Sequence, residues 1–278
     1  MKLYSMKTSN PLALKSFGLA ALLLCSQSAP GVEYNLVTNS TQTVPGLGGA
    51  NAIFDKSSLQ PTGSGVFDPF LRVRDNDNFE QGFNTSAPGN PPDGFNAING
   101  VWTHDLLLSS LQVVTHFGSG SYYQFILDLG EPGNETAENA DNELVLLKTF
   151  NLYTGNNDAP TSLEIGDDPN NLGTKRFDLA GNTIMLFDEN SGNGQADVNI
   201  FVPTSAFAGV TDTYLYLYTE IGKNHIGAPI DGDAEGSYEE FAARTGTSVP
   251  DGGATVALMG LALGGLSLSR RFLKVPTA

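Results

Sequence analysis

TYLYLYTEI, at residues 213–221, decides the fold class that the sequence predicts. Its tyrosines, Tyr214, Tyr216 and Tyr218, fall on every second position, and leucines fall between them. A period of two residues puts the rings on one face of a β-strand and the leucines on the other. We interpret the row of rings as cross-strand packing within a sheet, with a sugar-stacking platform as the alternative.

Eight further apolar runs are separated by clusters of Gly, Pro, Asn and Asp, which is typical of short strands and turns. They predict strands at 34–38, 66–74, 106–109, 111–116, 122–129, 144–153, 183–188 and 198–203. Leu71 and Val73 are expected to face inward, and Arg72 and Arg74 to face solvent. The only helix predicted in this region is short, at Glu235–Arg244. Strands without helical crossovers predict an all-β fold, an antiparallel, jelly-roll-like β-sandwich.

The first residues have the order of a secretory signal peptide: three lysines, an apolar run at 17–25, and small residues up to Ser28. We predict cleavage before Ala29, so that residues 1–28 form a signal helix that is removed. Cys25 is the only cysteine of the chain and would be lost with it. The exported domain would then be held together by packing alone.

The C-terminal segment, 249–278, joins a turn motif to an uncharged apolar stretch and a basic tail. The motif consists of Val249, Pro250, Asp251, Gly252 and Gly253. The stretch 254–269 makes about 24 Å of helix, which is short for a hydrocarbon core of about 30 Å but sufficient when flanking arginines reach the headgroups. Arg270 and Arg271, in the basic tail 270–278, place the C-terminus in the cytoplasm and the main domain outside.

Three glycines of this predicted transmembrane helix share one face. Gly260 and Gly264 are four residues apart, and Gly265 lies beside the second of them. Small residues at this spacing let another membrane helix approach closely. They predict a packing face for a helical partner within the membrane.

The order of motif, apolar helix and arginine pair resembles the PEP-CTERM class of bacterial sorting signals, in the variant with VPDGG or VPDSG as its motif. The resemblance implies export by the secretion machinery and recognition by exosortase, a membrane-embedded cysteine transpeptidase that cuts near the motif. It also implies an inner-membrane-anchored precursor in a Gram-negative-type bacterium. The mature protein would reside on the cell surface or in the extracellular matrix, in association with exopolysaccharide.

The middle of the chain more loosely resembles an uncharacterised domain of PEP-CTERM proteins. The resemblance rests on residues 63–85, 102–114, 122–131 and 214–244. It supports one β-rich domain at 29–248 and implies no activity.

The predicted exported domain, 29–248, is far more acidic than the net charge of −16 for the whole chain suggests. Six of the 14 basic residues belong to the two ends and only one of the 30 acidic residues does, which leaves eight basic and 29 acidic residues, or a net charge of −21. Nucleic-acid binding is disfavoured, because a polyanion requires a basic face. Asn39, Asn84 and Asn134 stand in glycosylation-type sequons, which we interpret as coincidental in a chain rich in Asn and Thr.

No catalytic constellation emerges from the sequence. His104 and Asp105 are adjacent, but neither a Gly-x-Ser-x-Gly motif nor triad spacing accompanies them. His116 and His225 are isolated. Paired carboxylates for glycoside hydrolysis stay possible, but 29 acids always offer some pair, so the pairing predicts nothing. We therefore predict no catalytic residues and a non-enzymatic protein.

No cofactor is predicted, although two acidic turns keep calcium open as an alternative. The first turn holds Asp231, Asp233, Glu235 and Gly236, followed by Glu239 and Glu240, but Ala242 stands where a calcium loop has its last acid. The second turn holds Asp188, Asn190, Asn193 and Asp197. Such residues also form turns by bonding their own backbone, so the pattern alone does not establish a metal site.

Two functions follow from these observations. The first, which we favour, is a non-enzymatic surface or matrix protein that acts by adhesion or binding. The alternative is a secreted polysaccharide-acting enzyme or a calcium-dependent carbohydrate-binding module. An enzyme should show a deep cleft with convergent acids, and a carboxylate pair buried in a cleft beside Trp102 would favour it.

Overall fold

The computed structural model describes the chain from residue 31 to residue 246, with gaps. The described residues are 31–57, 68–74, 78–87, 97, 101–116, 118–130, 144–156, 172–189, 194–223, 233–234 and 238–246. The predicted signal peptide and the whole segment 249–278, with its motif, glycines and arginine pair, lie outside these residues.

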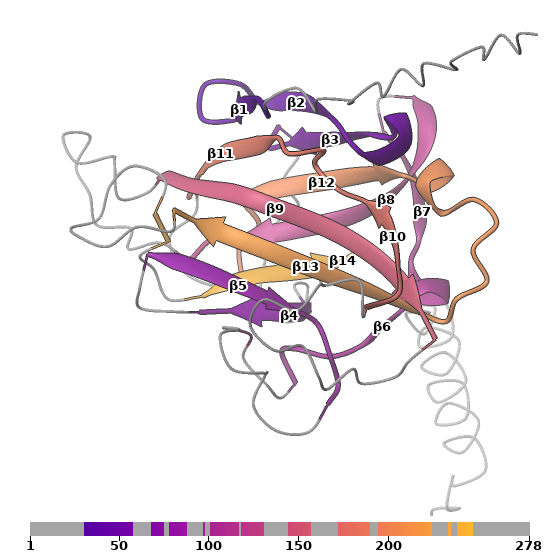
Figure 1. The fold of residues 1–278 in the computed structure, drawn as a ribbon. Coiled ribbons are helices and arrows are strands. Elements are labelled where there is room, and N and C mark those ends of the chain that lie inside the picture. The colour runs from indigo at the N-terminus through magenta and orange to yellow at the C-terminus, as the bar shows by residue number, and fades with distance from the viewer. Residues whose placement is uncertain are drawn as a thin grey trace, which may run out of the picture. The chain divides into compact units, whose positions relative to one another are not determined.

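Two β-sheets form two layers in the described part (Figure 1). The first sheet has the order β1-β11-β9-β13-β5, with β10 beside β9 and β6 beside β13. Its strands are β1 (Glu33–Asn35), β5 (Phe79–Phe83), β6 (Leu106–Leu107), β9 (Leu144–Gly155), β10 (Thr174–Phe177), β11 (Thr183–Phe187) and β13 (Tyr214–Gly222).

The second sheet has the order β2-β3-β12-β8-β14-β4, with β7 beside β8. Its strands are β2 (Thr41–Pro45), β3 (Asn51–Asp55), β4 (Pro69–Val73), β7 (Val113–His116), β8 (Ser119–Asp128), β12 (Val198–Pro203) and β14 (Glu239–Ala243). The helical elements of the described residues are 3₁₀ turns: η1 (Leu47–Gly49), η2 (Leu108–Ser110) and η5 (Thr204–Phe207). The prediction of a mainly β fold with two sheets is confirmed.

One strand pair departs from the predicted antiparallel arrangement. β1 pairs with β11 in parallel, with Glu33 opposite Thr183, so the first sheet is mixed while the second is antiparallel. A parallel pair needs a long connection between its strands, and most of the domain lies between these two in sequence.

All nine predicted strands overlap observed strands, and β12 has the predicted bounds. The predicted helix at Glu235–Arg244 is wrong, because residues 239–243 form β14, between β8 and β4. Phe241 is fully buried in the core between neighbours on both sides. β14 forms backbone hydrogen bonds with β8 on one side and β4 on the other. Tertiary pairing, and not the local sequence pattern, therefore determines its conformation.

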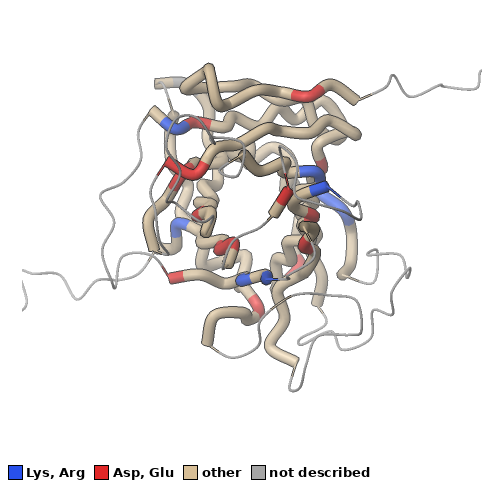
Figure 2. Tube along the Cα trace, turned by 90° about the vertical axis from the view of Figure 1, so that its left-hand side faces the viewer, with Lys and Arg blue, Asp and Glu red and all other residues tan. Residues whose placement is uncertain are grey.

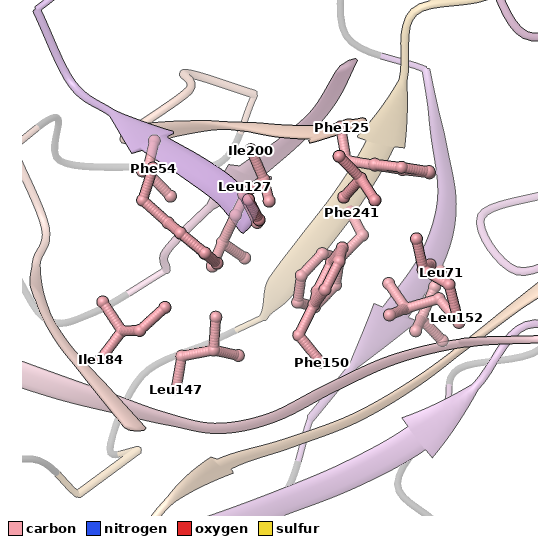
Figure 3. Close-up of a cluster of buried hydrophobic side chains, with 14 of the residues drawn as sticks. Phe54, Leu71, Phe125, Leu127, Leu147, Phe150, Leu152, Ile184, Ile200 and Phe241 are labelled. Atoms are coloured by element: carbon pink, nitrogen blue, oxygen red, sulfur yellow. The ribbon is translucent and has the colours of Figure 1, made fainter. Parts of the chain in front are cut away.

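The core lies between the two sheets, with Phe150 of β9 near its centre (Figure 3). Its ring centroid lies 5.8 Å from that of Phe125 and 6.1 Å from that of Phe241, both on the second sheet. Aromatic pairs at such distances add to the stability gained from burial. The domain is thus held together by interdigitated rings and aliphatic side chains from both layers.

The alternation along β13 is confirmed. Leu215 and Leu217 belong to the core, while Tyr216 and Tyr218 pack in a second cluster with Phe83 and other residues on the opposite face of the first sheet. Tyr216 is fully buried. The tyrosine row is therefore cross-strand packing, and the sugar-platform alternative for it is wrong.

Asn84, one of the sequon asparagines, is a buried structural residue just after β5. Its Nδ2 donates to the backbone carbonyls of His104 and Leu215, each at 3.1 Å, and its Oδ1 accepts from the amide of Leu217 at 2.7 Å. All three side-chain bonds connect it to backbone groups that would otherwise lie unsatisfied next to β13. A side chain used in this way is not available for glycosylation in the folded protein.

Replacing Asn84 with alanine is expected to lower the free energy of unfolding by about 3 kcal/mol, because buried backbone groups lose their partners. Urea denaturation followed by circular dichroism would measure the change. Asn39 is a matched control: it is an exposed sequon asparagine whose partners among the described residues are Asn35 and Thr38, and Asn39→Ala should cost less than about 0.5 kcal/mol. Equal losses for the two variants would contradict the structural role of Asn84.

Candidate functional site

Polar and charged residues gather on the outer face of the second sheet, which we define as the face turned away from the first sheet. Along β8, Phe125 and Leu127 point into the core, so the alternate residue Asp128 points outward. Along β14, Phe241 points into the core, so Glu240 points outward. Glu240 lies directly opposite Asp128 in the ladder, so two carboxyl groups are cross-strand neighbours.

Four carboxylic acids lie near enough to one another here for their charges to interact, and we call them the carboxylate cluster: Asp128, Asp188, Asp197 and Glu240. They come from four segments: the end of β8, the residue after β11, the residue before β12, and β14. All four are buried. The chain between β11 and β12 passes from the first sheet to the second, and this crossing brings Asp188 and Asp197 to the other two.

Backbone amides hold two members of the cluster. The amide of Gly194 donates to Oδ2 of Asp128. The amides of Leu129 and Glu189 donate to the two carboxylate oxygens of Asp197, at 2.8 Å and 3.0 Å. Backbone groups after β11, before β12 and at the end of β8 therefore hold the cluster in place.

Burial changes the protonation of the cluster. It raises the pKa of Asp128 to about 8, and the charges of Glu240 and Asp188 add to the rise, while backbone amides oppose it. Burial likewise raises the pKa of Asp197 to about 8, with Asp188 and Asp128 adding to it. The pKa of Glu240 is also raised by burial, although the Arg72 guanidinium opposes that rise. The folded domain therefore keeps protons on this cluster at neutral pH.

Only part of the first predicted calcium turn lies within the described residues, and its two described glutamates point to opposite faces of β14. Glu239 lies on the same face of β14 as the core residue Phe241, whereas Glu240 faces outward, so the two acids cannot reach one ion together. Asp233 is buried, and Asp231 and Glu235 lie outside the described residues.

The second predicted turn is brought together in part. Asp188 and Asp197 join the carboxylate cluster, while Asn190 and Asn193 lie outside the described residues. Within the part of the chain that the structure describes, no three or more His, Cys, Asp or Glu side chains are arranged to hold a metal ion.

Next to the cluster, two arginines and two aromatic rings alternate, an arrangement that we call the arginine–aromatic stack. The Arg72 guanidinium lies 4.3 Å from the ring centroid of Trp102 and 4.7 Å from that of Tyr238. The Arg74 guanidinium lies 4.9 Å from the Tyr238 centroid, and its Nη1 donates to the tyrosine oxygen at 3.1 Å. Arg72 also forms an ion pair with Glu240, which links the stack to the carboxylate cluster.

The prediction that both arginines face solvent holds for Arg74, which is exposed, but is wrong for Arg72. Only 14% of the Arg72 side chain is exposed, because Trp102 and Tyr238 cover it. A period-two pattern assigns a residue to a face of the sheet but does not say which distant side chains lie over that face.

The segment that carries Trp102 runs along the edge of β4. The amide of Arg72 donates to the Thr103 hydroxyl at 3.1 Å, and the amide of His104 donates to the Phe70 carbonyl at 3.0 Å. These bonds fix the tryptophan backbone beside the arginine whose guanidinium its ring contacts.

The histidines do not form a catalytic relay in the described residues. Nδ1 of His104 contacts the backbone oxygen of Asp105 at 2.9 Å, whereas the Asp105 carboxylate accepts from the amide of Ser86. His116 stacks on Phe201 at 4.0 Å with Nε2 3.6 Å from Asp55, a pairing that no sequence spacing indicated. His225 lies outside the described residues.

The carboxylate pair Asp128–Glu240 lies close to Trp102, because Arg72 contacts both Glu240 and the Trp102 ring. Both carboxyl groups are buried. A polymeric substrate could not reach either group in this conformation. A shallow crevice too narrow for a water molecule lies against Asp197. It is lined by Leu36, Lys56, Leu129, Leu186, Phe187, Asp197 and Val198.

The fold and these two features define an all-β, two-sheet domain with a buried carboxylate cluster and an arginine–aromatic stack on one outer face. No known protein family, no curated protein and no solved structure matches this chain. Among the described residues, no helix is long and apolar enough to cross a membrane.

Proposed function

We propose that this chain is the precursor of an exported, non-enzymatic surface or extracellular-matrix protein that an exosortase system sorts. The observation that carries the proposal is the order of the tail: the motif 249–253, the apolar stretch 254–269 and the pair Arg270–Arg271 at the C-terminus. In this proposal residues 1–28 are removed on export. The domain 29–248 is a jelly-roll-like sandwich flanked by the signal helix and the transmembrane helix, and it acts by binding within the matrix.

The end of the described domain supports this division of the chain. The amide of Arg244 donates to the Gln124 carbonyl at 2.9 Å, and that of Gly246 donates to the Ser110 carbonyl at 2.8 Å. Tertiary hydrogen bonds thus continue to Gly246, three residues before Val249. A protease or transpeptidase that cuts at the motif would leave every described strand intact.

In a native host, intact mass and terminal peptides should show loss of residues 1–28 and a new C-terminus within 249–253. The double variant Pro250→Ala/Asp251→Ala should keep its tail and accumulate in the membrane fraction. Ser267→Ala, within the apolar stretch, is the matched control and should be processed normally. Mature protein from exosortase-containing cells that still carries the Arg270 peptide would overturn the sorting proposal.

A polysaccharide-acting enzyme is a second candidate, favoured by the Asp128–Glu240 pair. Burial raises the pKa of Asp128 to about 8, whereas the Arg72 guanidinium opposes the effect of burial on the pKa of Glu240. The two carboxyl groups therefore differ in environment, as the general acid and the base of a glycosidase do. Opening of the outer face would be needed to expose them. Release of reducing sugars from soluble polysaccharides, abolished by Asp128→Asn, would establish this candidate in place of the first.

A further inference from the structure

We propose that the arginine–aromatic stack is a binding site for an uncharged glycan chain, which would stack on Trp102 and receive hydrogen bonds from Arg74. The proposal concerns the folded domain and is independent of how the two ends are processed. Four side chains form the site: Trp102, Arg72, Tyr238 and Arg74.

The platform is held in place before any ligand arrives. Arg72 is clamped between the Trp102 and Tyr238 rings and paired with Glu240, so its guanidinium is a fixed support for the indole. The backbone bond from Arg72 to Thr103 adds a second restraint on the tryptophan segment. Pre-ordering of this kind lowers the entropy cost of binding.

The platform is also accessible. Trp102 is 42% exposed although it contacts Arg72, and the adjacent Val101 is 74% exposed. A large ring at the surface with a polar tip offers a broad contact area at a low cost in side-chain entropy. The apolar C–H face of a sugar ring is a partner of matching shape and polarity for such a surface.

Arg74 supplies the polar part of the site. It is exposed, it bonds to the Tyr238 hydroxyl, and it forms no ion pair with a carboxylate of the described residues. Most other cations of the described domain are paired, for example Lys56 with Glu189 at 2.5 Å and Arg176 with Asp212 at 3.0 Å. In a domain with 29 acids, an exposed arginine beside a fixed aromatic platform is suited to donate hydrogen bonds to the hydroxyl oxygens of a sugar.

The charge of the domain selects an uncharged chain. Acidic positions are spread over both layers of the described strands (Figure 2), and the predicted exported domain has a net charge of −21. A long polyanion would extend beyond the two arginines into this field, which reaches about 8 Å at physiological salt. A cationic ligand would have to displace Arg72, which already occupies the space between the rings.

The single tryptophan of the chain makes the test direct, because tryptophan fluorescence, excited selectively, reports on Trp102 alone. We would titrate the full chain in detergent with the neutral polysaccharides dextran, laminarin, xyloglucan and galactomannan, and with the acidic polysaccharides alginate and polygalacturonate. At least one neutral polysaccharide should shift the fluorescence and retard the protein in affinity electrophoresis. Trp102→Ala should weaken that retardation about tenfold or more, and Arg74→Ala about fivefold.

Two exposed residues away from the stack serve as controls. Arg244→Ala removes an exposed arginine and Val113→Ala an exposed apolar side chain, and both should bind like the wild type. Unchanged melting temperatures would show that all four variants fold. Three results would each overturn the proposal: no binding to any neutral polysaccharide, binding that Trp102→Ala does not weaken, or binding to the acidic polysaccharides alone. None of these results depends on whether the segment 249–278 is removed.

Discussion

Replacing Phe150 with alanine is expected to lower the free energy of unfolding by about 4 kcal/mol. The ring of this β9 residue lies within 6.5 Å, centroid to centroid, of those of Phe54, Phe125, Phe177 and Phe241. Three of the four partners belong to the second sheet and one to β10 of the first. Loss of the ring would therefore leave a cavity between the layers, where no local shift of one strand can fill it.

Guanidinium unfolding monitored by circular dichroism would measure this loss. Phe150→Leu, which keeps most of the volume, should cost only about 1.5 kcal/mol. Phe79→Ala is the control for removing a phenyl ring at the margin: Phe79 is half-buried at the start of β5 and contacts Lys148, and its loss should cost about 1 kcal/mol. A loss for Phe150→Ala no larger than that for Phe79→Ala would show that the two layers do not depend on this ring.

The fold class could be predicted from the sequence because local patterns determine it. The alternation in β13 places Leu217 in the core and Tyr216 in the second cluster, and the strong apolar runs all overlap strands. The missed strands β2, β3, β5 and β10 are four or five residues long, and several are polar on one face. Their conformation comes from pairing with longer neighbours, such as β3 with β12, which no local pattern records.

The outer-face features could not be predicted in the same way. Asp128 and Asp197 are 69 residues apart, and only the pairing of β8 with β12 brings them together. Trp102 and Tyr238 cover Arg72 from opposite parts of the sequence. The acidic pattern at 188–197 is the local signal in the sequence that indicates part of the cluster, but it predicts a calcium turn and not a buried group of carboxyls.

We expect the folded domain to be more stable at pH 5 than at pH 8. The carboxyl groups of Asp128 and Asp197 titrate near their ordinary value of 3.8 in the unfolded chain but have a pKa of about 8 in the folded domain. Between these values the folded state holds protons that the unfolded state has lost, so raising the pH favours unfolding. The two groups belong to one cluster, so we count one proton that the folded state keeps and the unfolded state loses. For one such proton, the free energy of unfolding falls by about 3 kcal/mol between pH 5 and pH 7.

Urea unfolding at pH 5, 6, 7 and 8 would measure this slope. Asp128→Asn keeps the shape and removes the charge, so it should flatten the slope and raise stability at pH 8. Asp212→Asn is the control, because the pKa of Asp212 is shifted in the opposite direction. Hydrogen bonds from Thr154 and Arg176 lower this pKa, so the contribution of Asp212 to stability is lost only when the pH falls below the ordinary aspartate pKa. That variant should leave the slope between pH 5 and pH 8 unchanged.

Adding calcium distinguishes a carboxylate cluster that holds protons from a carboxylate cluster that binds a metal ion. The described carboxylates are not arranged as a metal site, so millimolar calcium should leave the stability at pH 8 unchanged. A calcium-dependent gain at pH 8 that Asp128→Asn abolishes would show instead that the four carboxylates converge on a cation, since a bound ion stabilises only the state that binds it. Stability that rises from pH 5 to pH 8 without calcium would contradict protonation of the cluster itself, because a buried carboxyl group of raised pKa can only lose stability as it ionises.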